Sequence, residues 1–586
     1  MSAPSVARRP EFRSLSCVVD ARPLAELAAL ALVVAVWAVL TLLIDPLGNF
    51  PLNDDWVYGL AVRSILQTGH FALPSPSSAN LLLQAYWGAL FCLPFGFSFT
   101  ALRVSTMVLG AIGLGALYLL LRELGAARRI AVAGALTLAV NPLYLGLAAS
   151  FMTDVPFTSL VTAALLLYVR GVKRANAVLV GLAFLLAFGA IFIRQFGLVL
   201  PLAFGVAHLV RKGTSGRTLA AALLPVLLGV ALQLLYEHWL IATGRTPVVP
   251  VPLGGLLSGS PLLFAERAAL AILVALPNLG LGVAPFLACF AFTRRGRPLI
   301  GLPRPGTSWQ VQALLCALLT LGLVASGAPL PALGDVLVPS GLGPLTLRDT
   351  WVLRIHEPRI PGLVTVLWLA MTVVSAWAAI ALVLAIAEMV AGAVRNFKVP
   401  EWRSTAWPQV LLLAVLGSYA AGLLLVSGSS SIFDRYFVPL IPIALALLLI
   451  DRGHREPMPD RTRDLLPGAI FIALYAAFAV TATHDYLAWN RARWRATDSL
   501  MQSGVTPHHI DGGYEFDGWY LYRPIYQVKP GKSYWWVDDD EYVIASGPLS
   551  GYHEVAQFRV NRWLALTESQ VLVLRRAGAR SKSLLF

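Results

Sequence analysis

The sequence predicts an all-α polytopic membrane protein of about 13 transmembrane helices, followed by a small C-terminal α/β domain outside the membrane. Three observations predict this fold class: the composition, the spacing of long apolar runs, and a change in composition near residue 483. Of the 586 residues, 57% are hydrophobic and only 13% are charged, and the mean hydropathy is +0.71. A soluble protein could not bury so many apolar side chains, and the short alternating segments of a membrane β-barrel do not occur in the sequence.

Thirteen apolar runs are long enough to cross a bilayer. They cover residues 24–44, 100–121, 130–149, 155–170, 176–193, 196–210, 218–241, 267–292, 309–326, 362–392, 408–427, 435–450 and 465–482. The first run follows a basic arm and is too long for the core of a signal peptide, so we expect an uncleaved anchor. A further run, 81–97, is short and contains Pro94 and Gly96. We expect it to form a re-entrant or interfacial helix.

Basic residues between the runs predict the orientation of the chain. Lys and Arg concentrate in cytoplasmic loops, and with 13 crossings six basic groups fall on the same side as the N-terminal arm. The groups are Arg122/Arg128/Arg129, Arg170/Lys173/Arg174, Arg211/Lys212/Arg217, Arg294/Arg295/Arg297/Arg304, Arg395/Lys398/Arg403 and Arg452/Arg455/Arg461/Arg463. The net charge of +14 is then a consequence of membrane topology, and no nucleic-acid partner is expected.

This topology divides the chain into three parts. A cytoplasmic N-terminal arm (1–23) precedes a transmembrane domain (24–482), whose long first outer loop (45–99) carries interfacial helices. An extracytoplasmic domain (483–586) follows, in which a helical stretch at 488–503 precedes three strand-like runs. The runs are Tyr542–Ala545, Glu554–Val560 and Val571–Leu574. Helical and alternating patterns together predict a small α/β domain.

Two acidic sites lie where predicted spans meet the outer side. Asn53-Asp54-Asp55 lies in the first outer loop, and Asp154 lies at the next outer turn, before Val155-Pro156. Carboxylates at a membrane edge are costly unless the protein uses them. Each also has a purely structural interpretation, because Asn and Asp are common helix N-caps and proline fits the first helical turn. Neighbouring helical residues point about 100° apart, so Asp54 and Asp55 need not face the same way.

Two arginines lie on the outer side, which the positive-inside rule depletes. Arg194 falls between the fifth and sixth spans, and Arg435 opens the twelfth. Both are candidates to bind a phosphate group. Arg435 could instead form a local ion pair with Asp434, and Arg194 could pair across helices with Glu237 or Asp154. Weaker basic candidates are Arg63 and Arg103.

The order of these features resembles the C-superfamily (GT-C) glycosyltransferases, in particular the branch that contains protein O-mannosyltransferases and lipid A aminoarabinose transferases. The resemblance covers roughly residues 24–482. The matching stretches are Leu52-Asn53-Asp54-Asp55-Trp56-Val57-Tyr58, Ala85-Tyr86-Trp87, Met152-Thr153-Asp154-Val155-Pro156, and Phe433-Asp434-Arg435-Tyr436 with Pro439 and Pro442. One stretch departs from the pattern. The aminoarabinose transferases carry a lysine shortly before the tyrosine-tryptophan pair, where this chain has Asn80-Leu81-Leu82-Leu83-Gln84.

The resemblance implies a membrane glycosyltransferase that moves a sugar from a polyprenyl-phosphate donor to a lipid, glycan or protein acceptor on the outer side of the membrane. It implies that Asp54 activates the acceptor, that Asp55 replaces a glutamate of the family, and that Asp154 is a second acid that orients the acceptor. An inverting displacement needs one carboxylate as base. The expected substrate-binding residues are Arg194, Gln195, Tyr58, Tyr86, Glu237, Arg435 and Tyr436. Some members of the family bind a divalent cation between such acids, so a cation is possible here.

Two other classes of function stay open. A transporter or lipid flippase would place polar sites near the bilayer midplane and often shows internal repeats, whereas the acids and arginines here concentrate at the outer ends of the spans. A membrane scaffold without activity would make Asp54 expendable. The absence of a targeting peptide and the abundance of Ala and Leu indicate a bacterial inner membrane.

The C-terminal tail contains two groups of potential metal ligands. They are His508-His509 with Asp511, and Asp538-Asp539-Asp540-Glu541. Neither matches a recognised metal-binding loop, so we expect both to be solvated turns.

Overall fold

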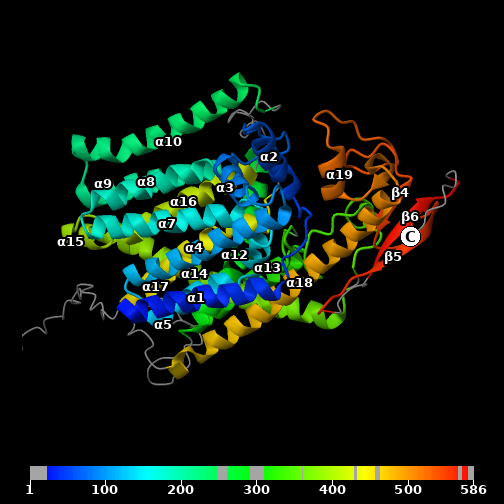
Figure 1. The fold of residues 1–586 in the computed structure, drawn as a ribbon. Helices are drawn as coiled ribbons and strands as arrows, with labels where there is room; N and C mark the ends of the chain where they lie inside the picture. The colour runs from blue at the N-terminus through cyan, green and yellow to red at the C-terminus, as the bar shows by residue number, and fades with distance from the viewer. Residues whose placement is uncertain are drawn as a thin grey trace, which may run out of the picture.

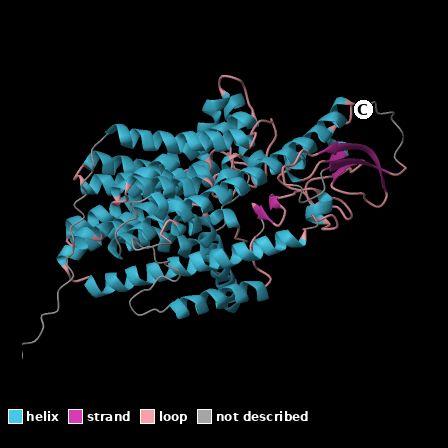
Figure 2. Ribbon diagram, turned by 90° about the horizontal axis from the view of Figure 1, so that it is seen from below, coloured by secondary structure: helices cyan, strands magenta, loops and turns pink. Residues whose placement is uncertain are grey.

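The computed structural model describes residues 23–246, 261–290, 309–333, 335–358, 360–427, 432–455, 462–564 and 570–578. Apolar helices lie side by side in a bundle, and a small sheet lies beyond one end of it (Figures 1 and 2). The α-helices are α1 (Pro23–Leu43), α2 (Asp55–Thr68), α3 (Leu82–Cys92), α4 (Phe99–Glu123), α5 (Arg128–Ala139), α6 (Pro142–Ala148), α7 (Asp154–Lys173), α8 (Ala177–Ile191), α9 (Val199–Lys212), α10 (Gly216–Ala242), α12 (Pro261–Ala288), α13 (Trp309–Ala325), α14 (Gly362–Asn396), α15 (Pro400–Thr405), α16 (Trp407–Ser427), α17 (Leu440–Arg455), α18 (Leu466–Gln502) and α19 (Tyr514–Leu521). The predicted class, a polytopic helical membrane protein, is confirmed. Of the N-terminal arm, residues 1–22 lie outside the described residues.

Each predicted span coincides with a described helix, but the helices differ in length. In the described part of the chain, eight helices are long and apolar enough to cross a membrane, and nine if the bent pair α5 and α6 forms one span. The other four are α8, α9, α13 and α17, which have 15, 14, 17 and 16 residues. A bilayer-spanning helix needs about 20 residues, so the number of 13 crossings stays a prediction.

The short run near residue 81 forms α3, which has 11 residues. At 1.5 Å per residue, α3 is about 16 Å long, roughly half the thickness of the hydrocarbon core. This length agrees with an interfacial or re-entrant helix. Helices α2 and α3 belong to the long first loop. They pack against each other, and each also packs against α4.

Helix α18 joins the bundle to the C-terminal unit without a break. It has 37 residues and continues across residue 483, where the sequence loses its apolar character. In Figure 1 it runs along the bundle and on to the sheet. The separate helix predicted at 488–503 is thus the second half of α18. A change from apolar to polar residues marks a change of medium and does not require the helix to end.

The C-terminal sheet has four strands in the order β3-β4-β6-β5. The strands are β3 (Ile510–Asp511), β4 (Tyr542–Ala545), β5 (Tyr552–Arg559) and β6 (Gln570–Arg576). β3 pairs with β4 in parallel, and the other neighbours are antiparallel. The three predicted strand runs correspond to β4, β5 and β6. Because α18 packs against β5 and β6, the sheet is attached to the end of the bundle.

A segment between α13 and α14 also folds at this end of the bundle. It forms a two-stranded hairpin of β1 (Leu337–Val338) and β2 (Gly341–Leu342), followed by a π-helical turn, η2 (Arg348–Val352). The β2 strand packs against α18. No element was predicted for this segment, which contributes Asp335 to the candidate active site.

The bundle has a basic end, and the acids and arginines of the predicted site lie at the other end. α7 begins at Asp154 and has Arg170 and Lys173 in its last turn, and α9 ends in Arg211 and Lys212. At this basic end, Arg122 pairs with Glu26 at 2.7 Å and Arg170 pairs with Glu123 at 2.7 Å. The acids and arginines singled out on the outer side in the sequence therefore lie at the opposite end from these basic clusters.

Candidate active site

The acidic turn before α2 separates its two aspartates. Asn53 has a φ of 51°, a left-handed conformation that Asn tolerates better than most residues. α2 then begins at Asp55, and Asp54 occupies the N-cap position without a side-chain capping bond. The Asp54 side chain is 23% exposed, whereas Asp55 is 1% exposed. The capping interpretation is therefore wrong for Asp54, whose carboxylate is available for other contacts.

Asp55 is bound inside the protein. Its carboxylate accepts hydrogen bonds from the backbone N–H groups of Leu52 at 3.2 Å and Phe151 at 2.8 Å. Burial raises the pKa of Asp55 to about 8, although the Arg103 guanidinium opposes this shift. Asp55 thus connects the first loop to the turn before α7. It does not point into the same space as Asp54.

Asp54 is held by two side chains from distant parts of the sequence. Arg435 Nη2 lies 3.1 Å from Asp54 Oδ2, and the Tyr514 hydroxyl donates to Asp54 Oδ1 at 2.9 Å. Arg435 belongs to the 3-10 turn η3 (Asp434–Phe437), and Tyr514 is the first residue of α19. The carboxylate thus lies between the bundle and the C-terminal unit.

Arg435 also binds a second acid, which the sequence analysis missed. Its Nε lies 3.1 Å from Asp335 Oδ2, and the Asn53 side-chain amide donates to Asp335 Oδ1 at 3.3 Å. Burial raises the pKa of Asp335, and Arg435 opposes the shift. The only sequence signal for Asp335 was an acid in the loop after the ninth predicted span, at the same end as Asp54 and Asp154.

The alternative of a local ion pair between Arg435 and Asp434 is wrong, because the Arg435 guanidinium binds Asp54 and Asp335. The Asp434 carboxylate accepts backbone N–H groups from Val336 at 3.2 Å, Leu337 at 2.7 Å and Arg435 itself at 2.7 Å. Asp434 therefore fixes the hairpin segment to η3, which brings Asp335 to the Arg435 side chain.

Arg194 pairs with the second predicted acid. Its Nη2 lies 2.8 Å from Asp154 Oδ1, and Asp154 is fully buried. Its Nε donates to the Thr153 hydroxyl at 2.7 Å. The N-cap of α7 is Thr153, and it forms no side-chain capping bond. The cross-helix pair with Asp154 is therefore the correct alternative for Arg194.

Two aromatic rings lie among these charges. The Tyr436 ring centroid is 5.6 Å from the Arg194 guanidinium and 5.7 Å from that of Arg435, distances at which cations and aromatic rings attract. Tyr58, on α2, is buried. Its pKa is raised by burial and then by the Asp54 carboxylate, and the Arg435 and Arg194 guanidiniums oppose the shift. Two of the three predicted tyrosines, Tyr58 and Tyr436, thus lie with the two ion pairs.

Of the three other predicted substrate-binding residues, Gln195 and Glu237 bind partners outside this cluster and Tyr86 is exposed. Gln195 donates to the Ser78 carbonyl at 3.0 Å. Glu237 accepts from the Gln233 amide at 2.8 Å, beside a buried Asn80 that contacts the same glutamine at 2.6 Å. Tyr86 is 43% exposed on α3. The contacts of Gln195 and Gln233 fasten the first loop to the neighbouring helices.

The two weaker basic candidates have other partners. The Arg63 guanidinium lies 4.4 Å from the Trp519 ring centroid. Arg103 is buried and donates to the backbone carbonyl of Phe50 at 3.0 Å. These contacts attach α2 to α19 and the first loop to α4, so both arginines stabilise the surroundings of the site.

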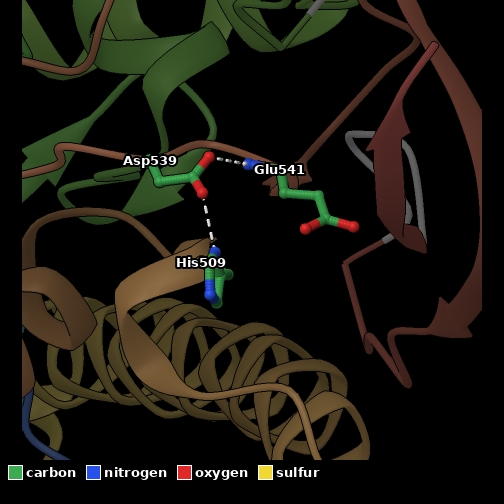
Figure 3. Close-up of side chains that lie close together, drawn as sticks. All are labelled: His509, Asp539 and Glu541. Carbon is green, nitrogen blue, oxygen red and sulfur yellow. Dashed lines mark hydrogen bonds and ion pairs between the residues drawn. The ribbon is translucent and has the colours of Figure 1, made fainter. Parts of the chain in front are cut away.

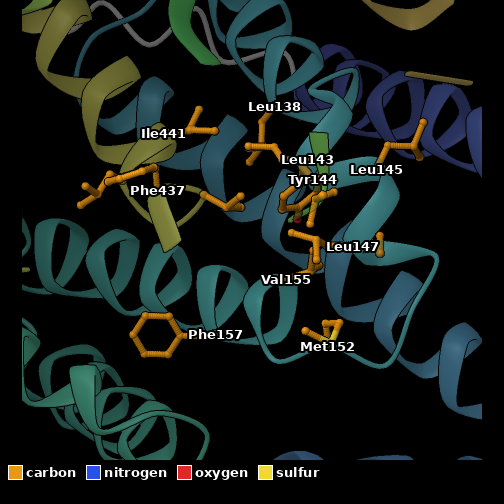
Figure 4. Packing of buried hydrophobic residues seen from close by; sticks show 14 of the residues in the cluster. Leu138, Leu143, Tyr144, Leu145, Leu147, Met152, Val155, Phe157, Phe437 and Ile441 are labelled. Atoms are coloured by element: carbon orange, nitrogen blue, oxygen red, sulfur yellow. The ribbon is translucent and has the colours of Figure 1, made fainter. Parts of the chain in front are cut away.

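An apolar core lies directly beneath the cluster. Figure 4 shows Met152, Val155 and Phe157 around the start of α7, with Phe437 and Ile441 from the chain that follows Arg435. The Met152 sulfur lies 3.9 Å from Arg435 Nη1. A low-dielectric support of this kind strengthens the ion pairs above it.

The potential metal ligands of the tail combine differently from the sequence grouping. Within the described residues, one group of three could hold a metal ion: His509, Asp539 and Glu541 (Figure 3). His509 Nδ1 lies 2.7 Å from Asp539, which also binds Arg576 at 3.2 Å, and Glu541 binds Arg575 at 2.9 Å. Because each carboxylate already has an arginine partner, this group is explained as a network of ion pairs.

Comparisons with known proteins agree with the resemblance recognised in the sequence. Residues 81–240 match the family model described as dolichyl-phosphate-mannose-protein mannosyltransferase, a segment that includes Asp154 and Arg194. No curated protein matches this chain in sequence.

Solved structures are similar at low identity. The S. cerevisiae protein O-mannosyltransferase Pmt1–Pmt2 complex bound to the sugar donor is 17% identical over 38% of this chain and about a third (34%) of that chain, with a TM-score of 0.31. ArnT from Cupriavidus metallidurans in the apo state is 15% identical over 94% of this chain and 98% of that chain, with a TM-score of 0.39. The same protein bound to undecaprenyl phosphate is 16% identical over the same shares, with a TM-score of 0.37.

Proposed function

We propose that this chain is an integral membrane glycosyltransferase that transfers a hexosyl or pentosyl group from a polyprenyl-phosphate donor to a lipid, glycan or protein acceptor. The observation that carries the proposal is the Asp54 carboxylate, partly exposed and bound to Arg435 at one end of an apolar helix bundle. Transfer from a lipid phosphate needs a base for the acceptor and a cation for the leaving phosphate. Asp54 and Arg435 are adjacent groups of these two kinds.

Asp54 is the proposed base. Of the three carboxylates bound to the site arginines, the Asp54 side chain is 23% exposed, Asp335 is 7% exposed and Asp154 is fully buried. In an inverting displacement, the acceptor O–H or N–H gives its proton to Asp54 while the acceptor atom attacks the anomeric carbon. The bond from that carbon to the phosphate oxygen breaks, and the polyprenyl phosphate leaves with the electron pair.

Arg435 is the proposed phosphate contact. A guanidinium has five N–H donors. Nη2 binds Asp54 and Nε binds Asp335, whereas Nη1 contacts the weakly accepting Met152 sulfur. Nη1 can therefore donate to a phosphate oxygen while the other contacts persist. This arrangement supplies a cation in place of the lysine that the chain lacks near residue 84.

Arg194, Asp154 and Asp55 have supporting roles in this proposal. Asp154 is too deeply buried to touch an acceptor and holds Arg194, whose charge adds to the positive potential beside Tyr436. Asp55 holds the first loop against Phe151. Within the described residues, Asp54 is not part of any three-residue group spaced for a metal ion, so no step here is assigned to a cation. Metal dependence is tested by assaying transfer after treatment with a chelator.

We place the site on the extracytoplasmic side of a bacterial inner membrane. The support for this orientation is the charge distribution, because the basic clusters lie at the opposite ends of helices such as α7 and α9, and such clusters face the cytoplasm. Labelling of a cysteine introduced at position 123 by a membrane-impermeant reagent added outside would contradict this orientation.

One assay separates the transferase from a transporter or flippase. Purified protein in detergent is incubated with a panel of polyprenyl-phosphate sugars and candidate acceptors, and the glycosylated product is measured. Reconstituted liposomes report donor flipping in parallel. We expect transfer with at least one donor. Flipping without transfer by any donor would favour the transporter.

A further inference from the structure

The first two residues of α19 form hydrogen bonds with the acidic turn of the first loop. The Tyr514 hydroxyl donates to Asp54 Oδ1 at 2.9 Å. Glu515 Oε1 accepts the backbone N–H of Asn53 at 3.0 Å. Two neighbouring residues of the C-terminal unit thus contact two neighbouring residues of the bundle, more than 450 positions earlier in the chain.

Glu515 is anchored from below by α18. Arg493 Nη2 lies 2.7 Å from Glu515 Oε2, and both side chains are fully buried. The Thr346 hydroxyl also donates to Glu515, at 2.5 Å. The residue before α19 is Gly513, with a φ of 84°, and a Cβ there would lie 2.4 Å from the Thr346 carbonyl oxygen. Only glycine allows the α19 N-terminus to approach this closely.

The Tyr514 ring is fixed independently of its hydroxyl. Its centroid lies 5.8 Å from that of Trp56, in an edge-on arrangement, and 5.5 Å from that of Trp535. Trp56 is fully buried on α2. Aromatic packing of this kind stabilises the ring position, so the hydroxyl presents a donor to Asp54 at a constant place.

On the basis of the proposed function, we propose that Tyr514 is a positioning residue for Asp54 and that α19 of the C-terminal unit completes the transferase site. Arg435 binds one oxygen of Asp54 and Tyr514 binds the other. Each carboxylate oxygen has two lone pairs, so each keeps one for the proton of the acceptor. Without Tyr514, the carboxylate is held at one oxygen and can rotate, which reduces the time it spends aimed at the acceptor.

The test compares Tyr514→Phe with Tyr522→Phe. Tyr522 also packs on Trp56, with a centroid distance of 5.4 Å, but its hydroxyl has no hydrogen-bond partner within the described residues. Both changes keep the ring and remove one hydroxyl. We expect kcat to fall about tenfold or more in Tyr514→Phe, since a hydrogen bond to a charged group is lost. The KM for the donor should change less than about twofold, because this hydroxyl contacts Asp54 and no donor-binding group is removed. Tyr522→Phe should match the wild type.

A double-variant cycle asks whether Tyr514 acts through Asp54. In an Asp54→Asn background, Tyr514→Phe should lower the residual single-turnover rate no further. An equal kcat for Tyr514→Phe and Tyr522→Phe would overturn the positioning role while leaving the transferase intact. A rise in KM alone would also overturn it, because Tyr514 would then be a substrate contact. Absence of transfer by the wild type with every donor would instead overturn the proposed function and this role with it.

Discussion

The two arginines of the site carry the same charge but are held in different ways. Arg194 binds Thr153 and Asp154, about 40 positions earlier in the chain, and its acid is fully buried. Arg435 binds Asp54, 381 positions away, and Asp335 from the hairpin segment. Asp54 in turn reaches Tyr514 in the C-terminal unit.

This difference indicates that the Arg194 pair stabilises the fold, whereas the Arg435 cluster takes part in transfer. An ion pair whose acid is fully buried can hold two helices together, but that acid cannot contact a substrate. The Arg435 cluster gathers residues from the first loop, the hairpin segment, η3 and α19, and its Asp54 side chain is partly exposed. We therefore expect changes at the Arg194 pair to act on stability and changes at the Arg435 cluster to act on transfer.

The largest expected effect is on folding, at the local pair. Asp154→Asn leaves the buried Arg194 guanidinium without its counter-charge, and removing one partner of a buried pair costs about 3–5 kcal/mol. The measurement is the unfolding of purified protein in detergent, with Asp538→Asn, an exposed and ion-paired aspartate of the tail, as a control for a small effect. Unchanged stability together with lost transfer would move Asp154 into the chemistry, as the family resemblance implied.

The next effect is on transfer, at the long-range cluster. Arg435→Lys keeps the charge but replaces the guanidinium fork with a single ammonium, which cannot serve Asp54, Asp335 and a phosphate in the same geometry. We expect kcat/KM to fall about a hundredfold, equivalent to about 2.7 kcal/mol. Arg194→Lys is the matched comparison and should lose about tenfold or less in the protein that remains folded. Equal losses would remove the distinction between the two arginines.

A smaller expected effect is a pH dependence of the stability, which arises from buried aspartates in and next to α19. Asp511 and Asp517 are fully buried in the C-terminal unit, and Asp517 accepts the Gly512 N–H at 3.0 Å. Burial, and next the Asp511 carboxylate, raise the pKa of Asp517 well above its ordinary value of 3.8. The native state therefore binds this proton more tightly than the unfolded state does. Its stabilisation is complete below about pH 4 and is lost as the pH rises toward the raised pKa.

Asp517→Asn should remove this dependence. We expect the wild-type unfolding temperature to decline as the pH rises between about 5 and 8, and the decline to be shallower in Asp517→Asn. Identical slopes for the wild type and Asp517→Asn would contradict a protonated Asp517.

The sequence predicted the helical parts of the fold and most of the central cluster. A charged residue at the outer end of a span has a high free energy, and this can be recognised from each residue alone. The residues recognised in this way are Asp54, Asp154, Arg194 and Arg435. Asp335 and Tyr514 did not stand out, since an acid or a tyrosine in a polar loop costs nothing until the fold is known. Asp335 contacts Asn53, 282 residues earlier, and Tyr514 contacts Asp54, 460 residues earlier. A local sequence pattern cannot predict contacts over such separations.

The same limit applies to two other predicted substrate-binding residues, whose side-chain contacts the sequence could not give. Glu237 and Gln195 lie at the correct end of the bundle, but the position of a residue along a helix does not say which way its side chain points. Their partners, Gln233 and the Ser78 carbonyl, turn them toward the first loop. The alternative of an Asp434–Arg435 pair is wrong for a related reason. The side chains of adjacent residues in a 3-10 turn point in different directions, and each contacts a distant part of the chain.

Asp54→Asn tests the central claim most directly. The substitution keeps the shape of the side chain and a hydrogen-bond acceptor for Tyr514 but removes the base. We predict that transfer falls by about a hundredfold to ten-thousandfold, while donor binding and the unfolding temperature stay close to those of the wild type. Transfer by Asp54→Asn within about tenfold of the wild-type rate would contradict the assignment of Asp54 as the base.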